Sequence, residues 1–587
     1  MANYYSGRRH AAVMRNSARR NKILIFIFGF WIIALFFRLV RIQVVDHDFL
    51  ATRARRNTSY VFEVAPRRGE IIGRRGWKLA QTMDSKSLLA YPARISNPSQ
   101  TAKALSSILG QDVRDIENKL SRHDRFLIFL KRALTPRERK SVESLRDSGL
   151  EFSDDLTRVY PGASLATHVV GDVDIDLRGI TGLESTFDGN LRGKPARSII
   201  ELDATGRAYD DYWEESPAND SELTTTIDEV LQMKLEILLE SACKELRAAT
   251  ASAIVLAPDS GEVLALANAP SFDPNSRPRA GFDFRVDRAV EVIYEPGSVL
   301  SFVTCAAGLE ERVIALRPVA NGSDKGLRIG LERPRLSPAD RDSFRTIRKK
   351  YSLFDRLTGW AIASGLIMGK DRVAEYVDRF GLTRRTGIEL PAEASGRLLP
   401  LRLWDERTHV AIAVGHNIST SAVELVSAVA AIANKGESVQ PHLVTRMVGV
   451  GGSVIDRPTP IRRQIVTTET STIVTRILEQ EFEKWRGLIG EPSLLGVPVA
   501  CAIGSSSKLD EATRRYSKTR YMTSALGFLP DNKGGRAIIV VFDQTAGTRA
   551  AEKIAARTFC RIAKATLGGY DLPVASESPS PPSPEGN

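Results

Sequence analysis

The feature that most constrains this chain is an apolar run near its N-terminus, Ile23–Phe37, with the sequence ILIFIFGFWIIALFF. A helix needs roughly 20 apolar residues to cross a bilayer, and this run alone is shorter. The pattern continues through RLVRIQVV, however, where Arg38 and Arg41 can extend their charged ends to the interface. The sequence therefore predicts one membrane-spanning helix over residues 23–42.

A basic arm precedes this run and predicts its orientation. Residues 1–22 contain no acidic side chain and these cations: Arg8, Arg9, Arg15, Arg19, Arg20 and Lys22. Since cationic flanks stay in the cytoplasm, the chain beyond the helix is expected outside. A cleaved signal peptide is the alternative, but no small-residue cleavage site follows the bulky aromatic run. We expect a single-pass protein of the inner (cytoplasmic) membrane, with its N-terminus cytoplasmic and its bulk periplasmic or otherwise extracytoplasmic.

Beyond the helix, the composition and hydrophobic pattern of the 587-residue chain change twice. Residues 43–220 are charged and punctuated by Gly and Pro, which predicts an elongated α+β pedestal with short amphipathic helices. After residue 221, a strand leads into a long helix that Asp228 can cap, and two apolar runs flank a PDSG turn typical of a hairpin. Residues 221–568 therefore predict an α+β domain with helices flanking an antiparallel sheet. Residues 569–587 are rich in Pro and Ser and predict a disordered tail.

Composition argues against several classes of function. The chain is 43% apolar and 26% charged, so it can bury proper cores, and its net charge of +12 is modest for this length. No Lys/Arg run with interleaved aromatics indicates a nucleic-acid partner. The cysteines show no C-x-x-C or histidine-linked spacing and lie at Cys243, Cys305, Cys501 and Cys560. We therefore expect no nucleic acid, no metal site, no disulfide framework and no cofactor.

Short motifs follow one another in a recognisable order along most of the chain. RGEIIGRRGWKLA begins at Arg68, and RVYPGASLATHVVG and GITGLESTFDGNLRG follow it. Further on come TTTIDEVLQ, SGEVLALANAPSFDPN, RAVEVIYEPGS, FGLTRRTGIELPAE, IANKGESVQPHLV and GTRAAEKIA. In this order the motifs resemble those of class B penicillin-binding proteins, the membrane-anchored transpeptidases of septal or side-wall peptidoglycan synthesis. The resemblance implies a dimerisation-type pedestal followed by a transpeptidase-like domain. In the first motif, Gly73 and Arg75 replace the family's Asp and Asn.

The family's chemistry depends on a serine nucleophile and a lysine three positions later, on one face of a helix. The neutral lysine amine accepts the proton of the serine hydroxyl. Here EPGS places Ser298 at the nucleophile position, but the lysine position holds Ser301. A serine hydroxyl has no useful basicity at neutral pH, so Ser301 cannot replace that base. The resemblance therefore identifies Ser298 as a vestigial nucleophile and Ser301 as a degenerate position.

The two accessory motifs of the family are also degraded. The S-x-N motif needs an asparagine, and residues 322–416 contain none. The K-T-G motif uses its lysine to attract the substrate's carboxylate and its glycine to admit the peptide backbone. VACAIGSSSK places Ala502, Ile503 and Gly504 at these positions, so only the glycine and the following hydroxyl of Ser505 remain for substrate binding.

Two other S-x-x-K patterns, Ser241/Lys244 and Ser505/Lys508, are chance matches. The first lies in a helix that the family places far from the cleft. The second follows a strand, where residues three apart point to opposite faces. Neither supplies a replacement for the missing lysine.

These residues predict a non-catalytic homologue that keeps the transpeptidase fold as a scaffold. The resemblance implies, as partners, a membrane-embedded glycan polymerase and other cell-wall synthesis or division proteins. One alternative is an active peptidoglycan D,D-transpeptidase in which Ser298 is the nucleophile and the base is rearranged. Another is a sensor that binds a muropeptide, a peptidoglycan stem peptide or a β-lactam without turnover. The motifs do not distinguish division from elongation.

Overall fold

The chain forms two compact units in a computed structural model. One unit comprises Met1–Pro66 and Lys194–Ala218, and the other comprises Arg67–Gly193 and Asn219–Asn587. The structure describes the chain except residues 1–2, 51–58, 65, 123, 126, 194–195, 203–207, 214–220, 277–281, 315, 320–327, 332–336, 351–355, 406, 450, 456–458, 490–496, 511–514, 531–534, 546–547 and 569–587. The predicted disordered tail therefore lies outside the described residues.

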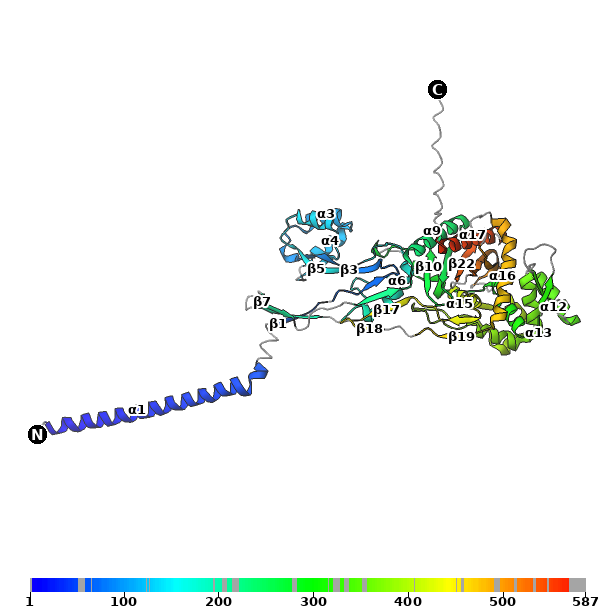
Figure 1. The fold of residues 1–587 in the computed structure, drawn as a ribbon. Helices are drawn as coiled ribbons and strands as arrows, with labels where there is room; N and C mark the ends of the chain where they lie inside the picture. Colours follow the sequence, from blue (N-terminus) through cyan, green and yellow to red (C-terminus); the bar gives the residue numbers. More distant parts are fainter. Residues whose placement is uncertain are drawn as a thin grey trace, which may run out of the picture. The chain divides into compact units, whose positions relative to one another are not determined.

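The first unit contains the predicted membrane helix. Helix α1 (Asn3–Val40) continues into a π-helical turn (Arg41–Val45) (Figure 1). Within the stretch Asn21–Val45, the most apolar 18-residue window has a mean hydropathy of 2.7, and none of that window is buried. By length and composition it can cross a membrane. A three-stranded antiparallel sheet completes the unit, in the order β1 (Ser59–Val64), β6 (Ala196–Leu202) and β7 (Ala208–Trp213).

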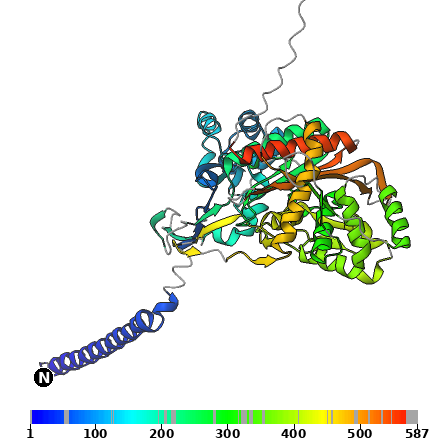
Figure 2. The same ribbon diagram turned by 45° about the vertical axis from the view of Figure 1, so that its right-hand side comes forward.

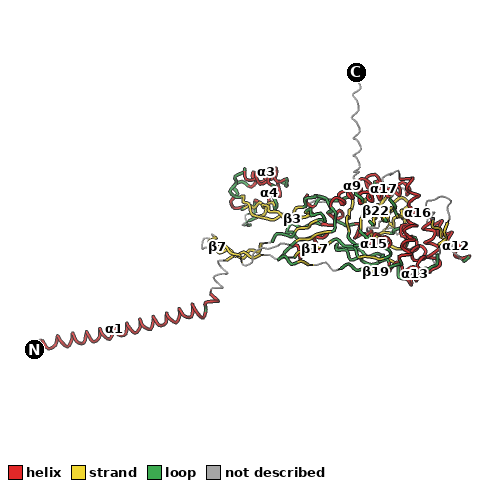
Figure 3. The backbone as a smooth tube through the Cα atoms, in the orientation of Figure 1, coloured by secondary structure: helices red, strands yellow, loops and turns green. Residues whose placement is uncertain are grey.

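The second unit is built on a five-stranded antiparallel sheet. Its strands run in the order β10 (Val263–Ala269), β9 (Thr250–Leu256), β22 (Arg536–Thr545), β21 (Arg515–Leu529) and β20 (Ala500–Asp510). Helices α9 (Glu229–Leu246) and α17 (Thr548–Thr566) cover one face, and α15 (Ala422–Ala433) covers the other. Figure 2 shows α17 in red, and Figure 3 shows the strands in yellow among these helices.

This sheet confirms the α+β architecture and several local predictions. Strands β9 and β10 form the predicted hairpin. The Asp228 side chain caps α9 by accepting hydrogen bonds from the backbone N–H groups of Val230 and Leu231, both at 3.1 Å. The polar cap and the apolar face of the helix act locally, so the sequence alone specifies this element.

A second, seven-stranded sheet lies in the same unit. Its main path is β18 (Val454–Ile455), β17 (Val444–Val448), β8 (Glu222–Thr225), β2 (Glu70–Ile72), β3 (Lys78–Ala90) and β4 (Ile128–Lys131), and β5 (Leu150–Val159) also pairs with β3. Helices α3 (Pro98–Leu109), α4 (Val113–Leu120) and α5 (Pro136–Glu143) share one apolar cluster with β3 and β4. The sheet takes strands from both sides of the domain boundary predicted at residue 220, and the division into pedestal and transpeptidase-like domain stays a prediction.

A buried ion cluster joins three of the motifs that the sequence singled out. The Glu184 carboxylate accepts from the guanidinium groups of Arg68, at 2.5 Å, and Arg158, at 2.7 Å. All three side chains are at most 1% exposed. Arg68 also pairs with Asp188 at 2.6 Å. Since an isolated buried charge is strongly disfavoured, this network requires all its members to be present together.

The turn between β2 and β3 is fixed to the start of α9. The Arg75 side chain pairs with Asp228 at 2.7 Å, and the Glu229 carboxylate accepts from the backbone N–H groups of Arg75 and Trp77. A Cβ on Gly73 would lie 2.2 Å from a carboxylate oxygen of Glu229. Both residues that depart from the family signature therefore suit the N-terminus of α9: Gly73 leaves room for the Glu229 carboxylate, and Arg75 pairs with Asp228.

Candidate active site

Ser298 lies in a tight turn that opens a buried helix. A 3-10 turn (η5, Gly297–Leu300) leads directly into α11 (Ser301–Glu310). Gly297 has a φ of +64° and donates its N–H to the carbonyl of Gly415 at 3.0 Å. A Cβ on Gly415 would lie 2.0 Å from the Gly297 carbonyl oxygen. Two glycines therefore permit the close backbone contact that holds this turn.

The Ser298 hydroxyl faces strand β20 at Gly504. A Cβ built on Gly504 would lie 2.3 Å from Ser298 Oγ, so a larger residue there would displace the hydroxyl from this position. The structure thus brings together the residues aligned with the family's nucleophile and with its K-T-G glycine. Ser298 is partly exposed, which leaves its hydroxyl open on one side.

Ala502, the residue aligned with the K-T-G lysine, lies on the side of β20 that faces Ser298. Ala502 lies on the same face of β20 as Gly504, because side chains two apart share a face. It is 7% exposed and belongs to the apolar cluster that also contains α11 and α15. Ile503 packs against the cluster on the opposite face. A buried methyl group therefore occupies the place from which a lysine would attract a carboxylate.

Ser301 begins α11 and is completely buried. Its Oγ has no hydrogen-bond partner among the described residues. Cys305 lies one helical turn further along the same face, and burial raises the pKa of its thiol to about 12. Neither group can accept a proton from Ser298 near neutral pH, so this face of α11 offers no base.

Helix α13 (Arg356–Arg379) packs against α11 where a second accessory motif is expected. A Cβ on Gly308 would lie 2.2 Å from Ser364 Oγ, which shows how closely the two helices approach. Thr358 and Ser364 are both fully buried. The helix therefore presents hydroxyl groups, not an asparagine amide, to this part of the core. Residues 351–355, which precede the helix, lie outside the described part of the chain.

Three further polar side chains on β20 already have partners. Ser505 Oγ lies 3.1 Å from Thr523 Oγ1, on the face of β20 opposite Gly504. Ser506 donates to the Glu295 carbonyl at 2.5 Å. Lys508 pairs with both carboxylate oxygens of Asp543, at 2.7 and 2.6 Å. Lys508 is therefore held as a countercharge.

Sequence reasoning missed a polar cluster around Glu295, three residues before Ser298. Its carboxylate accepts from the Tyr516 hydroxyl at 2.8 Å and from Asn417 N at 3.3 Å. His416 Nδ1 lies 3.4 Å from the same carboxylate, and both side chains are about 15% exposed or less. A carboxylate that orients an imidazole is an arrangement used in general-base catalysis. Its only sequence signal is that Glu295 belongs to the EPGS motif.

Comparison with known proteins gives a concordant result. Residues 251–564 match the penicillin binding protein transpeptidase domain, and residues 63–225 match the penicillin-binding protein dimerisation domain. Stage V sporulation protein D of Bacillus subtilis is 26% identical over 547 residues, covering 91% of this chain and 83% of that protein. The peptidoglycan D,D-transpeptidase FtsI of Escherichia coli is 24% identical, covering 91% of this chain and 89% of that protein.

Solved structures show the same fold at lower sequence identity. A peptidoglycan synthetase from Bifidobacterium adolescentis superposes with a TM-score of 0.62 at 19% identity, covering 88% of this chain and 98% of that one. The likeness extends over both the dimerisation and the transpeptidase regions. The motifs, the two matched domains and the relatives agree, and this chain belongs to the class B penicillin-binding proteins.

Proposed function

We propose that this protein is a non-catalytic penicillin-binding protein that serves peptidoglycan synthesis or cell division as a scaffold. The observation that carries the proposal is that the Ser298 hydroxyl faces Gly504, as the motif alignment expects, while the two positions aligned with the family's lysines hold uncharged residues, Ser301 and Ala502. Ser301 is buried without a hydrogen-bond partner among the described residues, and Ala502 packs in the core. The fold around the nucleophile is kept, and the groups that would activate it are gone.

The size of the expected defect supports this proposal. In serine hydrolases, removal of the nucleophile or its base lowers turnover about 10⁶-fold, which corresponds to roughly 8 kcal/mol of barrier. Here Ser301 stands at the position of the lysine base, and Ala502 stands at the position of the lysine that binds the substrate's carboxylate. The sensor alternative is disfavoured by the same change, because Ala502 supplies no charge for the carboxylate of a muropeptide or β-lactam.

The second candidate is an active D,D-transpeptidase with a rearranged base. One observation favours it: Gly415 contacts Gly297, so His416, in the loop packed against the nucleophile turn, lies beside Glu295 of the EPGS segment. In this alternative, the imidazole takes the Ser298 proton and the Glu295 carboxylate stabilises the imidazolium.

Reaction with a fluorescent penicillin separates these candidates. The full-length protein in detergent is incubated with the penicillin, denatured and separated by size, next to an active class B enzyme. We expect no covalent label, because β-lactams acylate the serine by the same route as substrate. In cells, Ser298→Ala should support normal growth.

Labelling that is stoichiometric and absent from Ser298→Ala would refute the scaffold proposal. If His416→Ala also removes that label while the variant keeps its unfolding temperature, the rearranged base is supported instead. Labelling that persists in Ser298→Ala marks non-specific acylation. The background level of such labelling is measured on the active enzyme after its own nucleophilic serine has been replaced.

As partners we propose a membrane-embedded glycan polymerase and further cell-wall synthesis or division proteins. The proposal rests on the relatives, which are named for sporulation and for peptidoglycan transpeptidation, and on the presence of both the apolar helix and the dimerisation domain. The helix would place the polymerase contact at the membrane, independent of Ser298.

A further inference from the structure

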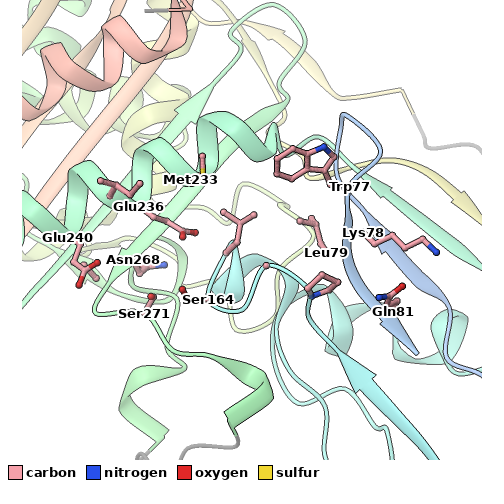
Figure 4. Close-up of a pocket in the computed structure, with 15 residues that line it drawn as sticks. Trp77, Lys78, Leu79, Gln81, Ser164, Met233, Glu236, Glu240, Asn268 and Ser271 are labelled. Atoms are coloured by element: carbon pink, nitrogen blue, oxygen red, sulfur yellow. The ribbon is translucent and has the colours of Figure 1, made fainter. Parts of the chain in front are cut away.

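A cavity of about 720 Å³ opens beside α9, away from the Ser298 turn. Its apolar wall consists of Trp77, Leu79, Leu165, Met233 and Ile237 (Figure 4). Trp77 is 52% exposed, Met233 40% and Ile237 38%. Single exposed apolar side chains need no explanation, but several around one cavity of this size are typical of a binding surface.

Two carboxylates stand on the same wall, one helical turn apart on α9. Glu236 Oε1 accepts from Ala166 N at 2.7 Å and from Gln232 Nε2 at 2.8 Å, whereas no described residue donates to Oε2. Burial raises the pKa of the Glu236 carboxyl to about 7. Glu240 is exposed, and its ion-pair partner among the described residues is Lys244, at 2.7 Å. A cation in the cavity would therefore meet one unused carboxylate oxygen and a second carboxylate nearby.

Among the described residues that line the cavity, the single basic side chain, Lys78, is directed elsewhere. Lys78 pairs with Glu70 at 2.7 Å, and its amine points away from Glu236 in Figure 4. In the same view the Glu236 and Glu240 carboxylates lie on the left and the Trp77 ring lies toward the right, with Lys78 and Gln81 beyond it. The cavity thus has an aromatic side and an acidic side, which is complementary to an apolar group followed by a cation.

We propose that this cavity docks a short segment of a partner protein on the same side of the membrane. The segment inserts an aromatic or branched aliphatic side chain beside Trp77 and Met233, and a lysine or arginine within two positions of it reaches Glu236 and Glu240. An anionic lipid headgroup or an acidic peptide would be repelled by the two carboxylates. The inference is independent of the scaffold proposal, since no step of it uses Ser298.

Selection from a displayed library of short random peptides tests this inference. The bait is the full-length protein in detergent at about pH 8, where Glu236 is ionised, with counter-selection on the Ile237→Ser variant. We expect enriched sequences to pair an aromatic or branched aliphatic residue with a nearby lysine or arginine. The best synthetic peptide should bind at least about tenfold more weakly to Ile237→Ser and to Met233→Ser, and about fivefold more weakly to Glu236→Gln.

The control is Ile175→Ser, which removes an exposed apolar side chain outside the cavity (45% exposed, against 38% for Ile237) and should leave peptide binding unchanged. Unchanged unfolding temperatures of the variants show that the fold is intact. The inference is wrong if no sequence is enriched, if enriched peptides are acidic or lack a cation, or if they bind Ile237→Ser as tightly as the parent.

Discussion

Asp287 is a carboxyl group buried just before the EPGS motif. It caps the short helix α10 (Arg288–Glu291) and accepts from Asn268 Nδ2 at 2.9 Å and Ala289 N at 3.1 Å through Oδ1. Its Oδ2 has no hydrogen-bond partner among the described residues. Burial raises the pKa of Asp287 from 3.8 to about 7. The uncharged carboxyl is therefore the form that suits this site.

This burial predicts a specific pH dependence of stability. Between pH 4 and 7, approximately, the folded protein binds a proton at Asp287 that the unfolded chain has released, so the free energy of unfolding falls as pH rises. Above that window the loss is on the order of 2–4 kcal/mol. Asp287→Asn keeps the Oδ1 acceptor and removes the charge, so we expect stabilisation at pH 8, roughly 2 kcal/mol, and little at pH 5.

Urea unfolding of the full-length protein in detergent at both pH values measures this effect. The exposed control Asp154→Asn should stabilise the protein at neither pH. Equal effects of Asp287→Asn at the two pH values would mean that the carboxyl does not titrate on unfolding.

At the scale of elements, the Arg68–Glu184–Arg158 cluster fixes β5, which carries Arg158, and the segment just before β2, which carries Arg68, to α7 (Gly182–Thr186). Two guanidinium groups share one carboxylate that is completely buried. The desolvation of these charges is offset only while Glu184 is ionised and in place. The cluster therefore ties together the part of the chain that the dimerisation-domain model matches.

Glu184→Gln is expected to destabilise the protein by about 3–5 kcal/mol, because it leaves two buried guanidinium groups with no shared countercharge. The matched control is Glu245→Gln, which breaks the more exposed pair with Arg557 and should cost about 1 kcal/mol or less. Denaturant unfolding of both variants provides the comparison. Similar losses in the two variants would show that the buried cluster is not a structural requirement.

At the scale of the whole molecule, we predict that the apolar helix α1 spans the membrane and so decides which compartment holds every other part. The cationic arm before Ile23 carries no acidic residue, so we predict that the N-terminus stays in the cytoplasm and that α17 ends outside it. Alkaline phosphatase fused after α17 should be active, and a fluorescent protein that folds only in the cytoplasm should be dark there. The same reporters fused before the helix provide the inverted control, and the opposite pattern would reverse the topology.

The sequence by itself determined the elements whose signals are local. The apolar run from Ile23, the Asp228 cap and the β9–β10 hairpin depend on side-chain type and on spacing over a few residues. The prediction that the catalytic lysines are missing likewise depends only on residue type, since the motif alignment places Ser301 and Ala502 at those positions. Such features need no knowledge of which distant segments meet.

Only the tertiary structure decided which distant residues share a site. Glu295 meets His416 and Tyr516, and Trp77 lines one cavity with α9, across more than a hundred positions of sequence in each case. No periodicity encodes such contacts, because they depend on how complete sheets and helices pack. The complete burial of Ser301 follows from that packing.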